Sequence, residues 1–230
     1  MKLLITSGGT SEKIDQVRSI TNHSTGKLGA LIAESFLAQG DQVTLVTTQN
    51  AVKPPAHPNL TIQIIENVQD LLETMQPLVK THGVLIHSMA VSDYTPIYMT
   101  SFEQITASQD LTEFLNKTND QGKISSKDEY QVLFLKQTPK IISQVKKWNP
   151  NIRLIGFKLL VDVSKEELLT VARASLAKNQ AEIIVANVLY DISNNQHHAY
   201  LVKENSVIEA NTKEEISQQL VTHIHTKDNL

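Results

Sequence analysis

Short, fully apolar runs alternate with amphipathic segments along most of this chain. Leu3 to Ile5 is a run of the first kind, and residues 28–36 then carry apolar side chains at helical spacing. A second apolar run follows at Gln42 to Thr47. Strand, helix and strand in this order predict a βαβ unit, in which the two strands are parallel and the crossover is right-handed.

The same alternation continues toward the C-terminus. After a loop enforced by Pro54-Pro55 and Pro58, Asn67 is expected to cap a helix, and Pro139 is expected to open another. Ser164 and Glu167 form a capping box for a helix that ends at residues 178–179. Further strands are predicted at residues 61–65, 83–87, 132–135, 153–157 and 182–187.

The end of the chain has the pattern of a β-hairpin, with strands at 198–202 and 206–210, followed by a helix capped by Thr212. Residues 98–127 lack clear periodicity apart from a short helix near Leu111 to Leu115, and long irregular segments are often binding loops. We therefore expect one α/β domain, 1–230, with a Rossmann-like, open, mainly parallel sheet flanked by helices. A flexible flap (98–127) and an appended hairpin and helix (197–230) complete it.

Composition narrows the classes of partner. The net charge of -3 and the pI of about 6.2 argue against nucleic acid or an anionic membrane as the main partner. The chain has no cysteine, which excludes disulfides, thiolate metal sites and cysteine nucleophiles. Neither a signal segment nor an apolar run approaching about 20 residues is present, so we expect a soluble, cytoplasmic protein.

Two stretches near the N-terminus favour an anion site. Gly8-Gly9 follows the first strand, where glycine lets the backbone approach a ligand closely. Asn22 to Gly29 then supplies small polar residues and Lys27 at the start of a helix, whose free N–H groups attract anions. The stretch is not a P-loop, because Leu28 follows Lys27, and it lacks the three glycines of the dinucleotide fingerprint.

These stretches together closely resemble the nucleotide-binding opening of phosphopantothenate–cysteine ligases, enzymes of coenzyme A biosynthesis. A second match is Ala90-Val91-Ser92-Asp93-Tyr94, and a third is Ala186-Asn187. The positions that carry the opening match are Gly8-Gly9-Thr10-Ser11-Glu12, Asp15, Val17-Arg18, Ile20 and Asn22-His23-Ser24-Thr25-Gly26-Lys27-Leu28-Gly29.

The resemblance implies roles for individual residues. Asn22 would stabilise the activated acyl group, and Lys123 in the flap would close over it; both are the implied catalytic residues. Arg18, Asn22, Ala90 and Val91 would bind the substrate. The implied nucleotide contacts are Gly8, Gly9, Ser24, Gly26, Lys27, Gly29, His87, Ser88, Met89, Asp93, Lys123, Pro139, Ile141, Phe157 and Lys178.

The chain also departs from the family pattern. The flap has Lys123-Ile124-Ser125-Ser126 where many bacterial members have Lys-x-Lys-Lys, and Lys140 replaces an acid after Pro139. Ala174 stands where a second lysine precedes Lys178, although Arg173 is nearby, and Val188 replaces an acid after Ala186-Asn187. Part of the usual triphosphate site is therefore absent or is supplied by other residues.

The resemblance further implies the reaction and its partners. CTP, with Mg²⁺, would activate the carboxylate of 4'-phosphopantothenate as an acyl-cytidylate, and the amine of L-cysteine would then form the amide. The family is dimeric, so a homodimer is expected, with Arg18 reaching the phosphate of the neighbour's substrate. A stand-alone ligase is expected, with a separate flavin-dependent decarboxylase acting next. Residue types alone do not distinguish CTP from ATP.

Two other functions remain open from the residues. A strand, glycine turn and helix also begin NAD(P)-dependent oxidoreductases, although no acid ends the strand at 42–47, where a ribose contact is expected. A non-catalytic nucleotide or flavin-binding module is the other alternative. His197-His198 and His223/His225 have no neighbouring cysteines, and we assign no protein metal site.

Overall fold

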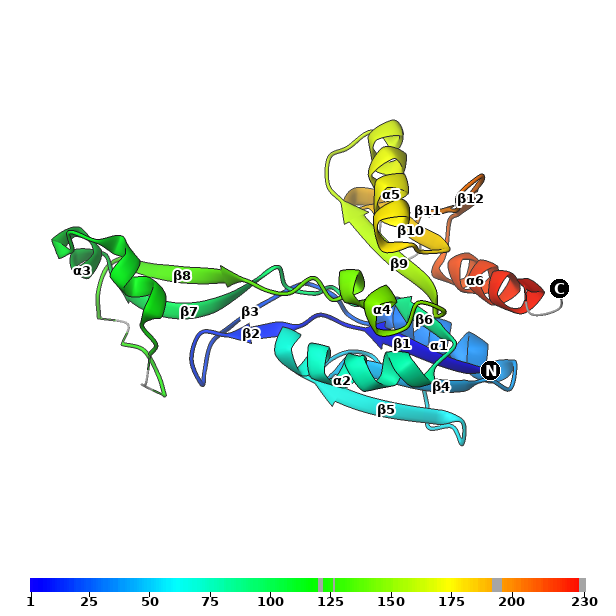
Figure 1. Ribbon diagram of the computed structural model, residues 1–230, viewed down its shortest axis with the longest axis horizontal. Coiled ribbons are helices and arrows are strands. Elements are labelled where there is room, and N and C mark those ends of the chain that lie inside the picture. The colour runs from blue at the N-terminus through cyan, green and yellow to red at the C-terminus, as the bar shows by residue number, and fades with distance from the viewer. Residues whose placement is uncertain (120–121, 126, 192–195, 228–230) are drawn as a thin grey trace.

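An eight-stranded sheet forms the body of the molecule, in the order β12-β11-β10-β9-β6-β1-β4-β5 (Figure 1). This computed structural model describes residues 1–119, 122–125, 127–191 and 196–227. The strands of the sheet are β1 (Lys2–Ser7), β4 (Gln42–Thr48), β5 (Leu60–Ile65), β6 (Val84–His87), β9 (Arg153–Leu160), β10 (Ile183–Val188), β11 (Ala199–Val202) and β12 (Val207–Ala210).

Six neighbouring strands of this sheet are mutually parallel, in the spatial order β5-β4-β1-β6-β9-β10. This order is that of a doubly wound nucleotide-binding sheet. In such a sheet the chain winds outward in both directions from β1, and the crevice lies where the carboxyl ends of β1 and β6 diverge. The predicted Rossmann-like, mainly parallel sheet is confirmed. The central strands read as continuous apolar runs because helices cover both faces.

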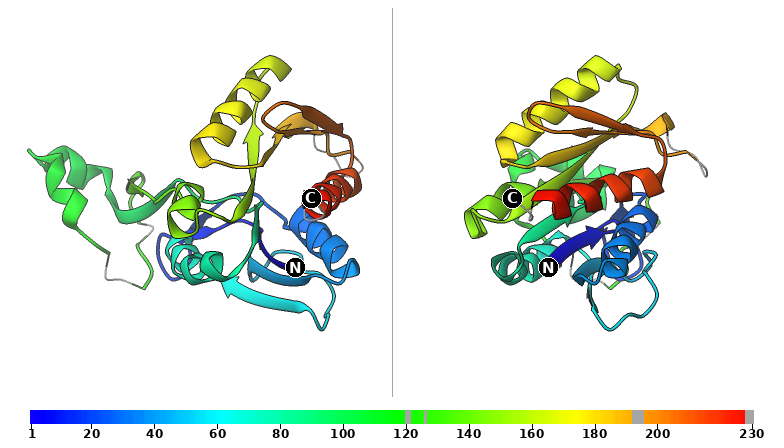
Figure 2. Two further views of the ribbon diagram at one scale, coloured as in Figure 1. Left: turned by 45° about the vertical axis from the view of Figure 1, so that its right-hand side comes forward. Right: turned by 90° about the vertical axis from the view of Figure 1, so that its right-hand side faces the viewer.

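Helices cover both faces of the sheet (Figure 2), and two clusters of apolar side chains fill the spaces between the sheet and these helices. On one face lie α1 (Lys27–Ala38) and α6 (Lys213–Lys227), which contribute Phe36 and Ile216 to the first cluster. On the other face lie α2 (Val68–Thr81), α4 (Ile142–Trp148) and α5 (Lys165–Asn179). Asn67 caps α2 and Ser164 caps α5, as predicted, each accepting a backbone N–H three residues ahead.

The C-terminal hairpin and helix are continuous with the body. Strands β11 and β12 add to the sheet edge antiparallel to β10, and α6 packs beside α1. Asn211 donates its N–H to Glu215, and Thr212 accepts the N–H of Glu215, so the predicted cap of this helix is present. The hairpin thus closes a core that the parallel strands alone would leave exposed.

Residues 94–137, between β6 and α4, form an arm that projects from the body (Figures 1 and 2). Its strands β7 (Tyr94–Ser101) and β8 (Gln131–Gln137) pair antiparallel in a separate two-stranded ribbon. A helix, α3 (Phe102–Ala107), and a 3₁₀ helix, η1 (Leu111–Asn116), follow β7. Tyr98, Phe114 and Phe134 stack in its centre.

The segment between β6 and β9 differs from two expectations. Residues 98–127 are not uniformly irregular, because β7 and α3 occupy 98–107; the aromatic packing that orders them is cross-strand and invisible to helical periodicity. The short helix near 111–115 is confirmed as η1, and Ser126 lies outside the described residues. Helix α4 begins at Ile142 and not at Pro139, because residues 138–140 still connect it to β8.

A glycine sets how closely α1 approaches the end of β1. A Cβ on Gly29 would lie 2.5 Å from the Cβ of Ser7 and would also overlap its Oγ. Gly26, just before α1, has φ +76°, which favours glycine for a second reason. Both residues were predicted to contact a nucleotide, and their packing alone already requires glycine.

We expect Gly29→Ala to lower the free energy of unfolding by about 1–3 kcal/mol through this overlap, although alanine is the better helix former. Urea unfolding measures the change. Gly83→Ala is the matched control, because no atom lies within 4 Å of its added Cβ. Ser7→Gly relieves the overlap but removes the hydrogen bond from Ser7 Oγ to the carbonyl of Gly26 (3.0 Å), so it should cost less stability in the Gly29→Ala background than in the unmodified chain. A Gly29→Ala variant as stable as the unmodified chain would contradict the packing argument.

Candidate functional site

The loops that follow β1 and β6 are joined at the carboxyl edge of the sheet. Gly9 and Ala90 form an isolated parallel bridge, in which Thr10 donates its N–H to the carbonyl of Ala90 (3.1 Å). Ala90 in turn donates its N–H to the carbonyl of Gly8 (2.9 Å). The two matched motifs therefore meet at the switch point of the sheet, as their positions in the sequence predict.

Three buried hydroxyl groups extend this junction. Ser92 donates its N–H to Thr10 Oγ1 (2.9 Å), and Thr10 donates its hydroxyl to Ser92 Oγ (3.0 Å). Thr138 donates its hydroxyl to the carbonyl of Ser92 (2.5 Å) and its N–H to the carbonyl of Asp93 (3.0 Å). The network fixes three loops, after β1, β6 and β8, relative to one another. No hydrogen-bonding role for these hydroxyls could be predicted from local sequence patterns.

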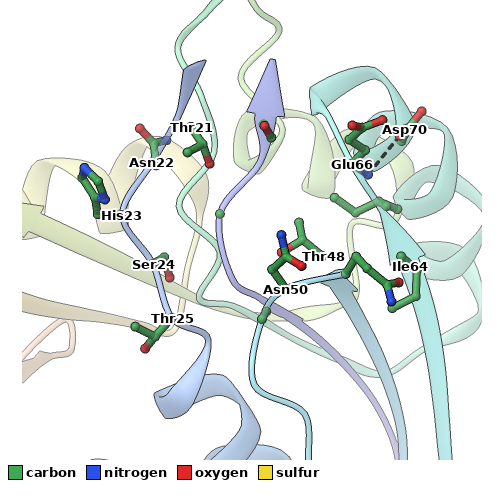
Figure 3. A pocket seen from close by; sticks show the side chains of 15 residues that line it. Thr21, Asn22, His23, Ser24, Thr25, Thr48, Asn50, Ile64, Glu66 and Asp70 are labelled. Atoms are coloured by element: carbon green, nitrogen blue, oxygen red, sulfur yellow. Dashed lines mark hydrogen bonds between the residues drawn. The ribbon is translucent and has the colours of Figure 1, made fainter. Parts of the chain in front are cut away.

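A cleft of about 740 Å³ opens beside the junction, on the side of β4 and β5 (Figure 3). Its walls are the segment after β3 (Ser19–Thr21), the loop after β4, and the end of β5. The residues that line it are Gly9, Ser11, Thr21, Asn22, His23, Ser24, Thr25, Thr48, Gln49, Asn50, Ala51, Ile64, Ile65, Glu66 and Asp70.

Asn22 lies at the boundary between this cleft and the junction. Its side chain lines the cleft, and its Nδ2 donates to the carbonyl of Ala90 (3.3 Å). A Cβ on Gly9 would lie 2.7 Å from the carbonyl oxygen of Asn22, so glycine there permits the close approach of the two segments. The structure thus brings the predicted Gly9, Asn22 and Ala90 together.

The segment from Asn22 leads directly into α1. Ser24 donates its N–H to the carbonyl of Asn22 (2.9 Å), and Ser24 lines the cleft. Gly26 is the residue before α1, and Lys27 is its first, solvent-exposed residue. Because the first N–H groups of a helix have no partner within the helix, this end of α1 suits an anion.

His87 ends β6 as a buried residue. Its Nδ1 and Thr6 Oγ1 are hydrogen bonded (2.8 Å), and burial lowers the pKa of His87 to about 4. The imidazole is therefore neutral near pH 7. Met89 donates its N–H to the same Thr6 oxygen (3.3 Å), and Ser88 donates its hydroxyl to the carbonyl of Thr6 (2.6 Å). His87, Ser88 and Met89 were predicted to contact a nucleotide. In the structure, all three form hydrogen bonds to Thr6 and so hold the end of β6 against β1.

Other predicted residues lie around this edge. Asp93 is 61% exposed in its side chain and is ion-paired with Lys140, the lysine that replaces the family's acid. Pro139 is exposed, whereas Ile141 is 2% exposed and packs in the core, so only its backbone could contact a ligand. Val91 is partly buried against the same cluster.

Phe157 and Lys178 lie on opposite faces of the sheet. Phe157 packs against the cluster beneath α1 and α6. Lys178 is exposed in the last turn of α5, where Ser143 of α4 donates its hydroxyl to Asn179 (3.3 Å). These two predicted nucleotide contacts therefore come from opposite faces of the sheet. The predicted contacts nearest the junction are Gly8, Gly9, His87, Ser88 and Met89.

Two acids of the opening motif have structural partners. Buried Glu12, in β2 (Ser11–Lys13), accepts the N–H of Val68 (2.9 Å), the first residue of α2. Asp15 accepts both Nε and Nη2 of Arg18 at 3.0 and 2.6 Å, and the Arg18 guanidinium holds the pKa of Asp15 well below its usual range. Glu12 is far in sequence from the helix that it caps and therefore leaves no local signal, so its capping role could not be predicted from the sequence.

The same contacts place the flap residue Lys123. Asp15 also accepts the N–H of Ile124 (3.1 Å), Arg18 donates to the carbonyl of Ile124 (3.0 Å), and Gln16 donates its N–H to the carbonyl of Gly122 (3.0 Å). Lys123 is exposed, and the residues on either side of it contact the turn between β2 and β3. It is held by its neighbours away from Asn22, which follows the other end of β3.

Three histidines of the C-terminal hairpin and helix have acidic partners. His198 pairs with Glu209, His223 with Glu182, and His225 with Asp41, at 2.6, 3.0 and 2.8 Å. Within the described ranges, no three His, Asp or Glu side chains are grouped so that they could hold a metal ion. The same part of the chain contains no helix that is both long and apolar enough to cross a bilayer.

Comparison with known proteins assigns the family. Residues 1–227 match the model of the DNA/pantothenate metabolism flavoprotein C-terminal domain. The chain belongs to this family. The resemblance seen in the Gly8-Gly9 and Asn22–Gly29 stretches is thus confirmed, and it favours the ligase-type domain over the oxidoreductase alternative.

Individual relatives agree with this family. The coenzyme A biosynthesis bifunctional protein CoaBC of Thermococcus kodakarensis is 32% identical over 95% of this chain, which spans about half (49%) of that relative's length. A solved DNA/pantothenate metabolism flavoprotein from Streptococcus pneumoniae is 59% identical, with a TM-score of 0.95 over 99% of both chains. The solved C-terminal domain of a CoaBC protein is 27% identical, with a TM-score of 0.74 over 99% of this chain and 95% of that one.

The neutral state of His87 generates a prediction about pH. The pKa of His87 is about 4 in the folded chain against about 6.5 when unfolded, so the unfolded state binds the proton first. Above pH 6.5 this histidine is mainly neutral in both states, and the stability that depends on its neutral form is fully present. As the pH falls from 6.5 to 4, protonation of the unfolded state lowers the free energy of unfolding by about 3 kcal/mol.

We expect His87→Gln to flatten the dependence of unfolding free energy on pH across this window, measured by urea unfolding at a series of pH values. Some dependence should remain, because burial also lowers the pKa of His197 to about 4. His57→Gln, at an exposed position in the loop before β5, is the control. An unchanged slope in the His87 variant would contradict the burial argument.

Proposed function

We propose that this chain catalyses the ligase reaction of coenzyme A biosynthesis, joining 4'-phosphopantothenate to L-cysteine. The observation that carries the proposal is the position of Asn22, between a cleft and the Gly9–Ala90 junction of the two family motifs. A carboxamide there can donate a hydrogen bond to an acyl oxygen. The family assignment, to a domain of pantothenate metabolism, supports this reaction type.

The proposed chemistry has two steps. A carboxylate oxygen of phosphopantothenate attacks the α-phosphorus of the nucleotide, the bond to the β-phosphate breaks, and pyrophosphate leaves. The amine of L-cysteine then attacks the acyl carbon, the bond from that carbon to the phosphate oxygen breaks, and the nucleoside monophosphate leaves with the electron pair. Both protons lost by the cysteine ammonium pass to solvent. Enzyme groups act by positioning and by stabilising the developing charge.

CTP is the proposed nucleotide, with Lys27 and the start of α1 near its phosphates. The described residues provide no three-carboxylate group for Mg²⁺, and Asp93 is already paired with Lys140. Magnesium would therefore be bound mainly by the phosphate oxygens of the nucleotide, as is usual for this ion. No step assigned to a residue here depends on it.

A homodimer is the proposed assembly. The arm exposes large apolar side chains, with exposed fractions of 49% for Phe102, 56% for Leu115 and 59% for Tyr130. Apolar groups gathered on a projecting element are typical of association surfaces. Pairing of two arms would also bring the Asp15–Arg18 turn and Lys123 near a second copy. A cytoplasmic location, and a decarboxylase that consumes the product, complete the proposal.

Pyrophosphate release tests the proposed function. The purified protein is given Mg²⁺, phosphopantothenate and either CTP or ATP, with and without L-cysteine. We expect release with CTP, faster turnover with cysteine, and formation of the amide product. No release with either nucleotide would refute the ligase assignment. Nicotinamide or flavin binding without release would support the oxidoreductase or binding-module alternatives.

Asn22 provides a sharper prediction. Asn22→Ala should reduce kcat on the order of 10²-fold, because a donor aimed at the developing charge is lost, while the KM for CTP changes little. Asn205→Ala is the matched control, since Asn205 is exposed in the turn between β11 and β12 and does not line the cleft. Equal losses in turnover and CTP binding would contradict a role for Asn22 at the acyl group.

A further inference from the structure

The Gly9–Ala90 bridge divides the carboxyl edge of the sheet into two sides. The cleft lies on the side of β4 and β5, whereas His87, Met89 and Phe157 come from β6 and β9 on the other side or from the loop beyond β6. The predicted nucleotide residues therefore account for only part of the cleft: Gly9 and Ser24 line it, and the wall formed by β4, β5 and α2 has no assigned ligand.

The chemistry of that wall does not suit a triphosphate. None of the described residues that line the cleft is lysine or arginine, and two of them, Glu66 and Asp70, are acids. Thr48 and Asn50 add uncharged donors, and Ile64 adds an apolar surface. A small zwitterion matches this set: its ammonium pairs with an acid, its carboxylate accepts from amide and hydroxyl groups, and its short side chain contacts Ile64.

Of the two acids, Glu66 is the one available to an ammonium group. Asp70 Oδ2 accepts the N–H groups of Glu66 (3.0 Å) and Asn67 (3.4 Å), and so belongs to the capping box of α2. Glu66 Oε2 pairs with Lys13 at 2.7 Å, where both side chains are about half exposed. An exposed pair of this kind contributes only about 0–1 kcal/mol, so a bound ammonium can replace Lys13.

Glu66 and Asn22 lie at the same end of the cleft. Ser11 donates its N–H to the carbonyl of Glu66 (2.8 Å), and Ser11 faces Thr21 in the β2–β3 ladder. Asn22 is the next residue, and Figure 3 shows Thr21, Asn22 and Glu66 around one end of the cavity. An amino acid held at Glu66 thus has its amine near the position that the proposed function gives to the acyl group.

We propose that the β4–β5 side of the cleft is the binding subsite for the amino-acid co-substrate, with Glu66 as the residue that receives its ammonium group. This inference rests on the proposed function for the identity of that co-substrate, L-cysteine. Glu66 binds the charged form; the amine that attacks has lost a proton to solvent and is no longer held by charge.

Calorimetric titration of the intact protein with L-cysteine tests the subsite apart from turnover. We expect binding in the millimolar range, about tenfold weaker in Glu66→Gln because a charge-assisted hydrogen bond is lost. Binding should be tighter in Lys13→Gln, which removes the competing cation. Glu73→Gln is the matched control, because Glu73 is an exposed acid of α2 outside the cleft and accepts only from Gln69 within the described chain.

If the Glu66 variant binds cysteine more weakly and the Lys13 variant binds it more tightly, the changes arise from charge pairing and not from misfolding. Equal melting temperatures of the variants and the unmodified chain would confirm that all of them are folded. In the pyrophosphate assay, Glu66→Gln should raise the KM for L-cysteine about tenfold and leave release in its absence unchanged. Absence of cysteine binding, equal binding in all variants, or a raised KM for CTP or phosphopantothenate instead would overturn the subsite. Failure of pyrophosphate release by the unmodified chain refutes the proposed function separately.

Discussion

The backbone contact between Gly9 and Ala90 is the constraint on which the candidate site depends. It extends the parallel pairing of β1 and β6 beyond the strands, where the two loops would otherwise separate. Gly9 is required because the carbonyl of Asn22 occupies the space of a side chain. One close approach therefore fixes three segments that are distant in sequence, and the hydroxyls of Thr10, Ser92 and Thr138 hold a fourth.

The opening motif combines ligand-facing and structural residues. Asn22 and Ser24 face the cleft, whereas Glu12 caps α2 and Asp15 organises the β2–β3 turn with Arg18. Loss of Glu12 would leave the N–H of Val68 without its acceptor and loosen α2, which supplies Asp70 at the rim. Mutational loss of activity in this motif therefore needs a stability measurement beside it before a role in chemistry is assigned.

Charge is distributed unevenly around the crevice. Lys27 and the start of α1 follow the segment that carries Asn22, whereas Glu66, just after β5, and Asp70, in the first turn of α2, line the β5 side of the cleft. A reaction that brings a polyanionic nucleotide and an ammonium group to one carbon is well served by such a separation, since each reactant meets the opposite charge. Neutral His87 between β1 and β6 adds no cation to the junction near pH 7.

The sequence by itself determined the parallel α/β body, because buried strands and amphipathic helices leave periodic signals, and the caps at Asn67, Ser164 and Thr212 are local. It also brought Gly9 and Ala90 to one edge, since strand ends converge in a doubly wound sheet. Only the tertiary structure decided that the hairpin completes the main sheet, that 98–107 is ordered by aromatic packing, and that Glu66 and Asn22 line one cleft. Those features arise from contacts between residues far apart in the chain, which no local pattern records.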